Sequence, residues 1–287
     1  MKKTLIIIIL FSSFVSSRAQ RNEIGPFLGT SYYLGDLNPS KHFLLTKPAF
    51  GLIYRYIFNQ RWALKISGLY GSVEGSDAKA KFNEKRNLSF KSPLFEASSQ
   101  LELNFLPYAT GNKEKNYFTP YIFAGVSIFN FNPKAKYNGT WYNLQPLGTE
   151  GQGTSSSNVK PYSLMKVAFP FGLGVKYSIG KNVSIGAEWG LRKTTTDYLD
   201  DVSTTYADPV ILGAEHGDIA AIMSNLSLPA EPGENTNITG SQRGNSGTKD
   251  WYSFAGVFIT FKFKTSGNKP CPAYSKHSKF KRYFNKD

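Results

Sequence analysis

Eight stretches of β-strand length follow one another along the chain, and in most of them apolar and polar residues alternate. The alternation is clearest in residues 182–193, where every second position is apolar: Val183, Ile185, Ala187, Trp189 and Leu191. Successive side chains of a strand point to opposite faces, so this pattern predicts a strand with one apolar and one polar face. We expect strands at residues 23–34, 48–58, 61–73, 94–106, 117–131, 165–179, 182–193 and 251–264.

The connections between these strands alternate between long and short. The long ones are residues 35–47, 74–93, 132–164 and 194–250, and the short ones are 59–60, 107–116 and 180–181. Outer-membrane barrels have short periplasmic turns and long outer loops, and they close their sheet because an unpaired strand edge is not stable in lipid. The pattern predicts an all-β fold, an eight-stranded antiparallel transmembrane outer-membrane β-barrel with both termini in the periplasm.

The N-terminal residues have the features of a secretory signal peptide. Lys2 and Lys3 precede an apolar run at 5–15, and Ser17-Arg18-Ala19 resembles a cleavage site. The apolar run is too short for a membrane-spanning helix, which needs about 20 residues. We expect a signal peptide at residues 1–19, the barrel at 20–264 and a periplasmic tail at 265–287, in a bacterial outer membrane.

Composition alone does not separate a membrane barrel from a soluble β-sandwich, but the distribution of charge is informative. The chain is 40% hydrophobic and 15% aromatic, with a net charge of +14. A basic balance can indicate nucleic-acid binding, but an exported barrel rarely meets nucleic acid, so we expect outer-membrane lipid as its surroundings. Residues 194–250 are acidic, with nine acidic residues against Arg243 and Lys249, whereas residues 265–287 are basic.

The inward faces of the strands bring charged side chains into one lumen. An eight-stranded barrel is just wide enough for side chains to fill it, and isolated buried charges are costly, so these charges should pair with one another. The expected salt-bridge network comprises Arg55, Lys65, Glu96, Glu102, Lys176, Glu188 and Arg192, with Lys166 on the same inward face. A lumen plugged in this way is the main hypothesis, and a narrow conducting pore is the alternative.

Residues that could support catalysis are scarce. The three histidines, His42, His216 and His277, belong to two long loops and the tail, so no compact Ser-His-Asp arrangement is predicted. The chain contains neither a phosphate loop nor a nucleotide-binding fingerprint. We therefore expect no enzyme activity and no cofactor.

An acidic motif at residues 196–203, Thr-Asp-Tyr-Leu-Asp-Asp-Val-Ser, begins the longest loop. Asp197, Asp200 and Asp201 are weak candidates for a calcium site, because Ca²⁺ takes six to eight oxygen ligands. Their spacing does not match an EF-hand, and the favoured interpretation is an ordered loop in which Asp and Thr side chains cap local turns. No metal site is predicted.

Three segments resemble the PorG family, outer-membrane barrels of the type IX secretion system of Bacteroidetes. They are residues 23–27 (Glu-Ile-Gly-Pro-Phe), residues 32–38 (Tyr-Tyr-Leu-Gly-Asp-Leu-Asn) and, as the most specific, the acidic motif at 196–203. The resemblance covers nearly the whole mature chain. It implies a non-enzymatic role in protein transport and gliding motility, and association with a periplasmic ring of PorK and PorN, called GldK and GldN in gliding species.

The basic tail at 265–287 is the candidate docking element for such a ring. Its basic residues alternate with aromatic ones, and protein interfaces favour Tyr and Phe as anchors within charged surroundings. The partner-binding candidates are Lys269, Tyr274, Lys279, Phe280, Lys281, Arg282 and Tyr283. A disordered basic tail near anionic envelope polymers is the alternative for this segment. For the whole protein, the alternatives are a small porin-like channel and a surface adhesin acting through its long loops.

Overall fold

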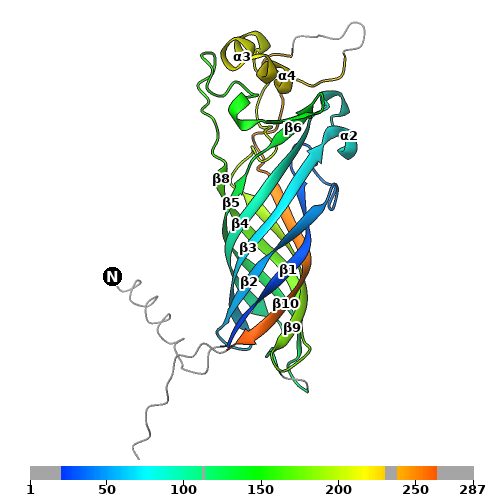
Figure 1. The fold of residues 1–287 in the computed structure, drawn as a ribbon, viewed down its shortest axis with the longest axis vertical. Helices are drawn as coiled ribbons and strands as arrows, with labels where there is room; N and C mark the ends of the chain where they lie inside the picture. Colours follow the sequence, from blue (N-terminus) through cyan, green and yellow to red (C-terminus); the bar gives the residue numbers. More distant parts are fainter. Residues whose placement is uncertain (1–20, 112–113, 230–237, 264–287) are drawn as a thin grey trace, which may run out of the picture.

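Eight long strands form an antiparallel sheet that closes on itself, because β1 pairs with β10 and β3 pairs with β4. The computed structural model describes residues 21–111, 114–229 and 238–263. Figure 1 shows the strands tilted around one elongated barrel. They are β1 (Arg21–Leu34), β2 (Lys47–Ile57), β3 (Trp62–Ser76), β4 (Ser89–Asn104), β5 (Phe118–Phe131), β8 (Met165–Ser178), β9 (Val183–Thr194) and β10 (Trp251–Phe263). The predicted eight-stranded antiparallel barrel is confirmed.

The two ends of the barrel differ in their connections. At the turn end, where β1 begins and β10 ends, the chain connects strands through residues 58–61, 105–117 and 179–182. At the loop end, the connections are residues 35–46, 77–88, 132–164 and 195–250. The predicted alternation of short and long connections holds only in part, because residues 105–117 at the turn end form a connection as long as residues 35–46 or 77–88 at the loop end. The predicted signal peptide and tail lie outside the described residues.

The wall of the barrel turns apolar side chains outwards and most of its charges inwards. Leu28, Leu52 and Val257 are 61%, 60% and 58% exposed, whereas Lys65 and Glu102 are fully buried. A soluble protein places its apolar face inside, so an apolar belt around a closed sheet is the surface expected of a barrel in lipid. Exposed aromatic residues near the turn end are Phe58, Trp62, Tyr117, Tyr177, Phe261 and Phe263. Aromatic side chains favour such positions because they suit the membrane–water interface.

The seam between β1 and β10 depends on a close approach of two backbones. A Cβ atom on Gly25 would lie 1.8 Å from the carbonyl oxygen of Ile259, so only glycine fits at this position. The next residue, Pro26, lacks a backbone N–H, and the pairing with β10 is formed on either side of it, at Ile24 and Phe27. The motif Glu-Ile-Gly-Pro-Phe at 23–27 therefore has a structural role in closing the sheet.

Strands β3 and β4 extend further than predicted, so residues 74–93 are not one loop. Their register runs without a break from Trp62↔Leu103 to Ser76↔Ser89. The alternation persists there with Val73 and Phe90 buried, but the outward positions become polar, as at Glu74 and Lys91. The apolar outward positions cover less of the chain than the strands do, which explains why the sequence pattern placed the end of β3 too early and the start of β4 too late.

The connection at 132–164 contains a hairpin that was not predicted. It consists of β6 (Lys134–Tyr137) and β7 (Thr140–Asn143), and β6 joins β4 through the pair Lys91↔Lys134. Asn138 and Gly139 connect the two strands with φ angles of 46° and 87°, which suits the type I′ turn of two-residue hairpins. The barrel wall thus continues beyond the belt as a small sheet of β3, β4, β6 and β7.

The remaining helices belong to the loop end, where Figure 1 shows α3 (Pro209–His216) and α4 (Asp218–Ser224) above the barrel. Asp208 caps α3 by accepting a hydrogen bond from Val210 N at 2.8 Å, and Pro209 occupies the first turn. The shorter helical elements are α2 (Asp77–Ala80), η1 (Glu84–Arg86) and η2 (Gln145–Leu147). In the part of the chain described, no helix is both long and apolar enough to cross a membrane.

Candidate functional site

The centre of the lumen holds a network of buried ion pairs around Glu102. Its carboxylate accepts hydrogen bonds from Arg55 Nε at 2.9 Å and from Lys176 Nζ at 2.8 Å, and Lys65 Nζ lies 3.9 Å away. Lys65 also forms an ion pair with Glu188 at 2.7 Å. These five residues come from β2, β3, β4, β8 and β9, so the network connects opposite sides of the wall.

A second layer of charge lies nearer the loop end. Arg192 Nε is 3.1 Å from Glu96 Oε2, and the Tyr252 hydroxyl donates to the same oxygen at 2.8 Å. Arg192 Nη1 also donates to the carbonyl oxygen of Gly190 at 2.6 Å. Glu96 thus has two donors and Arg192 two acceptors, as buried charges require.

Aromatic rings line the spaces beside the lumen cations. Each cation lies between 4.0 and 4.9 Å from a ring centroid, in the pairs Arg55–Phe258, Lys65–Phe123, Lys176–Tyr121 and Arg192–Phe254. A cation over the face of a ring is attracted to it, more strongly when water is excluded. Ion pairs and rings together therefore fill the middle of the barrel.

The structure brings all seven residues predicted for the lumen into these two layers. Lys166 is half-buried near the loop end, apart from both layers. One member, Glu23, was missed: its carboxylate lies 3.6 Å from Arg55 Nη1. The alternation in β1, with Ile24 and Leu28 exposed on the other face, was the signal that could have identified it. With Glu23 included, the two layers hold four acidic and four basic side chains.

Residues 105–111 close the lumen at the turn end. The Tyr108 hydroxyl donates to Ser184 Oγ at 2.7 Å, and the Thr110 hydroxyl donates to Glu23. Lys262 Nζ donates to the carbonyl oxygen of Thr110 at 2.7 Å. Because Tyr108 and Thr110 are buried, residues 105–111 of the connection at 105–117 fold into the mouth of the barrel as a plug.

At the loop end, the acidic motif is bonded within its own loop and to its neighbours. The Tyr33 hydroxyl donates to Asp200 and lies 3.2 Å from Asp250 Oδ1. Asp200 also accepts from Val202 N, and Asp250 accepts from Leu199 N, each at 2.9 Å. These bonds hold the start of the longest loop against the end of β1.

The other two carboxylates of the motif have separate partners. Asp201 accepts from the Thr149 hydroxyl at 2.5 Å and the Tyr162 hydroxyl at 2.6 Å, whereas Asp197 accepts from the Ser203 hydroxyl at 2.7 Å. Within residues 21–111, 114–229 and 238–263, no group of three or more His, Cys, Asp or Glu side chains could hold a metal ion. Asp197, Asp200 and Asp201, the weak calcium candidates, are therefore bonded to different partners.

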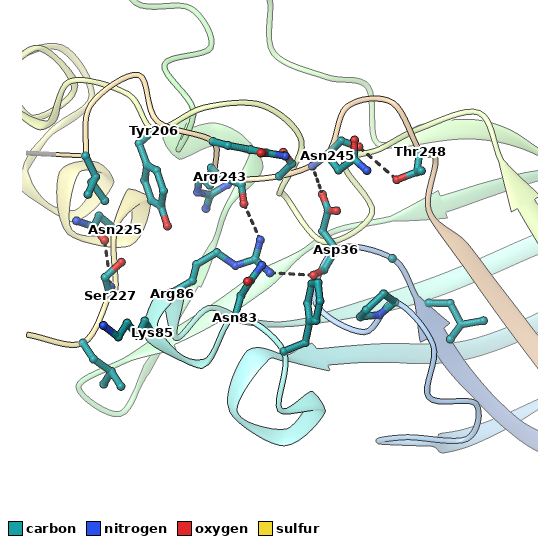
Figure 2. A pocket seen from close by; sticks show the side chains of 18 of the residues that line it. Asp36, Asn83, Lys85, Arg86, Tyr206, Asn225, Ser227, Arg243, Asn245 and Thr248 are labelled. Atoms are coloured by element: carbon teal, nitrogen blue, oxygen red, sulfur yellow. Dashed lines mark hydrogen bonds between the residues drawn. The ribbon is translucent and has the colours of Figure 1, made fainter. Parts of the chain in front are cut away.

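Two buried arginines connect the loops at the loop end. Arg86 forms an ion pair with Asp77 at 2.6 Å and donates to the carbonyl oxygens of Asp36 at 2.9 Å and Arg243 at 2.6 Å. Arg243 in turn forms an ion pair with Glu150 at 3.0 Å. Figure 2 shows Arg86 between Asp36 and Arg243, so residues from separate loops meet at one guanidinium group. We call this assembly of bonded loops at the loop end the loop cap.

A groove beside these arginines has a volume of about 1100 Å³. Its walls are mixed, with Phe82 and Leu228 as well as Asn83 and Lys249 among the lining residues. The two arginines that line it are engaged by protein oxygens, so they fasten the loops rather than present free charge to a ligand.

The loop cap buries more acidic than basic side chains. The buried acids are Asp77, Glu150, Asp197, Asp200, Asp201 and Asp250, and the buried bases are Arg86 and Arg243. Burial raises the pKa of Asp197 and of Asp201 to about 6. Burial and the neighbouring charge of Asp36 raise the pKa of Asp200, and burial and Asp200 raise the pKa of Asp250. Protonation of these carboxyls therefore relieves the excess of negative charge.

A family model described as a domain of unknown function, DUF6089, matches residues 2–208. The chain belongs to the DUF6089 family. The match covers the barrel as far as β9 and the acidic motif that follows it. No match is found among curated proteins.

Solved structures of outer-membrane proteins resemble the chain at low identity. Ail, the attachment invasion locus protein of Yersinia pestis, solved with the heparin analogue sucrose octasulfate, is 11% identical with a TM-score of 0.40, over 86% of this chain and 100% of that chain. Neisserial surface protein A is 9% identical with a TM-score of 0.41, over 84% and 97%. OprG from Pseudomonas aeruginosa is 10% identical with a TM-score of 0.38, over 86% and 98%. These values are too low to support any inference about a ligand or partner.

Removing one partner of the central network should destabilise the barrel more than removing a matched pair. Lys65→Met deprives Glu188 of its closest cation, and breaking a buried pair typically costs about 3–5 kcal/mol. Lys65→Met combined with Glu188→Gln removes both charges, so its cost should be smaller than the sum of the two single costs. Urea unfolding of the barrel in lipid vesicles, followed by tryptophan fluorescence, measures the difference. Lys160→Met, at an exposed loop position, is the control, and a Lys65→Met variant as stable as this control would contradict the network.

The backbone amides of the loop cap should be better protected from hydrogen exchange at pH 5 than at pH 8. In the folded cap, burial raises the pKa of Asp197 and Asp201 to about 6, above the value of about 3.9 in an unfolded chain. The folded state therefore favours the protonated form, and this stabilisation is complete below about pH 4 and lost as the pH rises through about 6. Hydrogen exchange of residues 195–229, corrected for the intrinsic pH dependence of exchange, measures this pH-dependent stabilisation of the folded cap. Asp197→Asn imitates the protonated form and should weaken the pH dependence. Equal corrected protection at both pH values would refute this assignment.

Proposed function

We propose that this chain is a non-enzymatic, non-conducting barrel of the outer membrane that anchors or positions a periplasmic ring of the PorK/PorN (GldK/GldN) type in the type IX secretion machinery. The observation that carries the proposal is the filled lumen, with Glu102 at its centre. A barrel that nothing can pass through acts by holding other molecules in place. The partner comes from the sequence resemblance to PorG.

The membrane setting is supported by the outer surface. Exposed apolar side chains on all sides of the sheet, such as Leu28, Val126 and Leu173, form a belt that hydrocarbon can cover. The signal peptide expected at residues 1–19 would deliver the chain across the inner membrane. We place the turn end, with both termini, in the periplasm, because short turns occupy that side in outer-membrane barrels.

Docking of the ring belongs at the turn end in this arrangement. Phe263, the last residue of β10, lies there, and the candidate docking residues from Lys269 to Tyr283 follow it in sequence. The plug at 105–111 lies at the same end of the barrel. A rigid plug beside a basic, aromatic tail would offer a ring protein a fixed surface and an electrostatic attraction.

A surface adhesin is the second candidate, and the loop cap favours it. The hydrogen bonds of Arg86, Asp201 and Tyr33 order the outer loops, which a protein acting only in the periplasm would not need. The porin-like channel has no comparable support, because ion pairs occupy the lumen centre.

The filled lumen predicts an absence of conductance. Purified protein in planar bilayers should give no stable, reproducible channel, because an ion would have to break the contacts of Glu102 to pass. The double variant Arg55→Ala/Lys176→Ala removes two donors of Glu102. It is the positive control and should conduct ions. Discrete channels in the wild-type protein would refute the plug and support the porin alternative.

The ring proposal predicts that the tail is needed for association. Deletion of the residues after Ser266 should leave a folded, heat-modifiable barrel that no longer co-purifies with ring proteins and no longer supports secretion. A full-length variant with Tyr274, Phe280, Tyr283 and Phe284 changed to Ser keeps the charge and separates anchoring by aromatic residues from electrostatic attraction. An epitope tag at Gly139, an open turn position, should be detected on intact cells and a tag after Asp287 should not. Ring and secretion at wild-type levels after truncation would exclude the tail as the docking element.

A further inference from the structure

Three lysines lie together on the outward face of the small sheet at the loop end. Lys91 of β4 is the cross-strand neighbour of Lys134 in β6, and Lys136 lies two residues further along β6. Residues two apart on a strand share a face, so the three side chains project from the same side. Lys91 and Lys136 are exposed and Lys134 is half-buried.

These lysines lack acidic partners among the residues that the structure describes. Glu74, opposite Lys91 in β3, forms its ion pair with Lys47 at 2.5 Å instead. Like charges directly opposite each other on neighbouring strands destabilise the pairing. The face therefore carries positive charge that a bound anion would stabilise.

The position of the lysines relative to the apolar belt indicates which anion they meet. Phe95, four residues after Lys91 and on the same face of β4, is 55% exposed and belongs to the belt. Trp141 of β7 is the cross-strand neighbour of Lys136 and is 51% exposed. Trp side chains favour the headgroup level of a membrane, and lysines reach from apolar surface to charged headgroups. Figure 1 shows β4 and β6 side by side at the upper end of the barrel.

We infer that Lys91, Lys134, Lys136 and Trp141 form a binding surface for phosphate groups of an anionic glycolipid in the outer leaflet of the membrane. The lysines neutralise the phosphates, and Trp141 packs at the level of the sugar and the upper acyl chains. Such a contact fixes the height and the rotational setting of the barrel, because the lysines lie on the β4–β6 side. The inference rests on the proposed outer-membrane setting, but it is independent of the ring.

A lipid-retention experiment tests this surface. The full-length barrel in neutral detergent is mixed with bisphosphorylated lipid A, and native mass spectrometry gives the fraction of protein that retains one lipid. Lys91→Gln, Lys134→Gln and Lys136→Gln in one variant should weaken retention roughly 100-fold, because each lysine near an anionic surface contributes about one kilocalorie per mole. The matched control changes the exposed residues Lys79, Lys81 and Lys160 to Gln, and it should bind within about twofold of the wild type.

Further arms identify what the surface recognises. Lipid A without its phosphates should bind the wild type and the lysine variant equally weakly, and inorganic phosphate at millimolar concentration should not displace the intact lipid. Displacement by phosphate would assign the surface to free anions, and retention of a polyglutamate peptide in place of the lipid would assign it to an acidic protein. Either result, or equal lipid retention by the two lysine variants, would overturn the inference. Ring association of the lysine variant should be unchanged, so that failure here is distinct from failure of the ring proposal.

Discussion

Burial of charge inside a closed sheet is the constraint on which the rest of this structure depends. Alternate side chains of eight strands face one narrow lumen, where an unpaired ion would be costly. Glu102 resolves this by accepting bonds from two cations and lying near a third, each from a different strand. Replacement of a buried ion pair by apolar residues can stabilise a protein. We therefore see the value of the network less in stability than in a lumen with a single arrangement of side chains.

The same constraint extends to the turn end but is met differently at the loop end. At the turn end, Glu23 is shared between Arg55 and the hydroxyl groups of Thr110 and Thr260, so the plug supplies a hydrogen-bond donor to a buried carboxylate. At the loop end, acids exceed bases, and hydroxyl groups such as those of Tyr33 and Tyr162 supply the missing donors. A hydroxyl donor tolerates either protonation state of its carboxyl partner, whereas the lumen pairs require charge on both sides. The bonds of the loop cap can therefore persist when its buried carboxyls, whose pKa values are raised by burial, take up protons.

Much of the barrel could be predicted from the sequence because lipid imposes a strict rule on outward positions. Apolar residues such as Leu28 and Val257 occupy every second position while a strand crosses the belt, so the sequence pattern indicates each strand. The same pattern indicates that Lys65 faces inwards. Beyond the belt the rule no longer applies, and the extension of β3 to Ser76 could not be seen in the same way. The hairpin at β6 and β7 had a local signal in Asn138-Gly139. By contrast, the ion pair of Arg243 with Glu150 joins residues 93 positions apart, and no local pattern predicts it.

The filled lumen separates the two ends of the molecule in a functional sense. Glu102 is bonded across the barrel and residues 105–111 lie in its mouth, so the lumen between the loop end and the turn end is occupied by side chains. Interior side chains that are close-packed and ion-paired also leave little freedom for a conformational signal to pass along the barrel. A filled barrel with an apolar wall is compatible with the proposed anchoring role, in which the wall stays in the lipid and a partner binds at one end. That combination favours the proposed anchor over a channel.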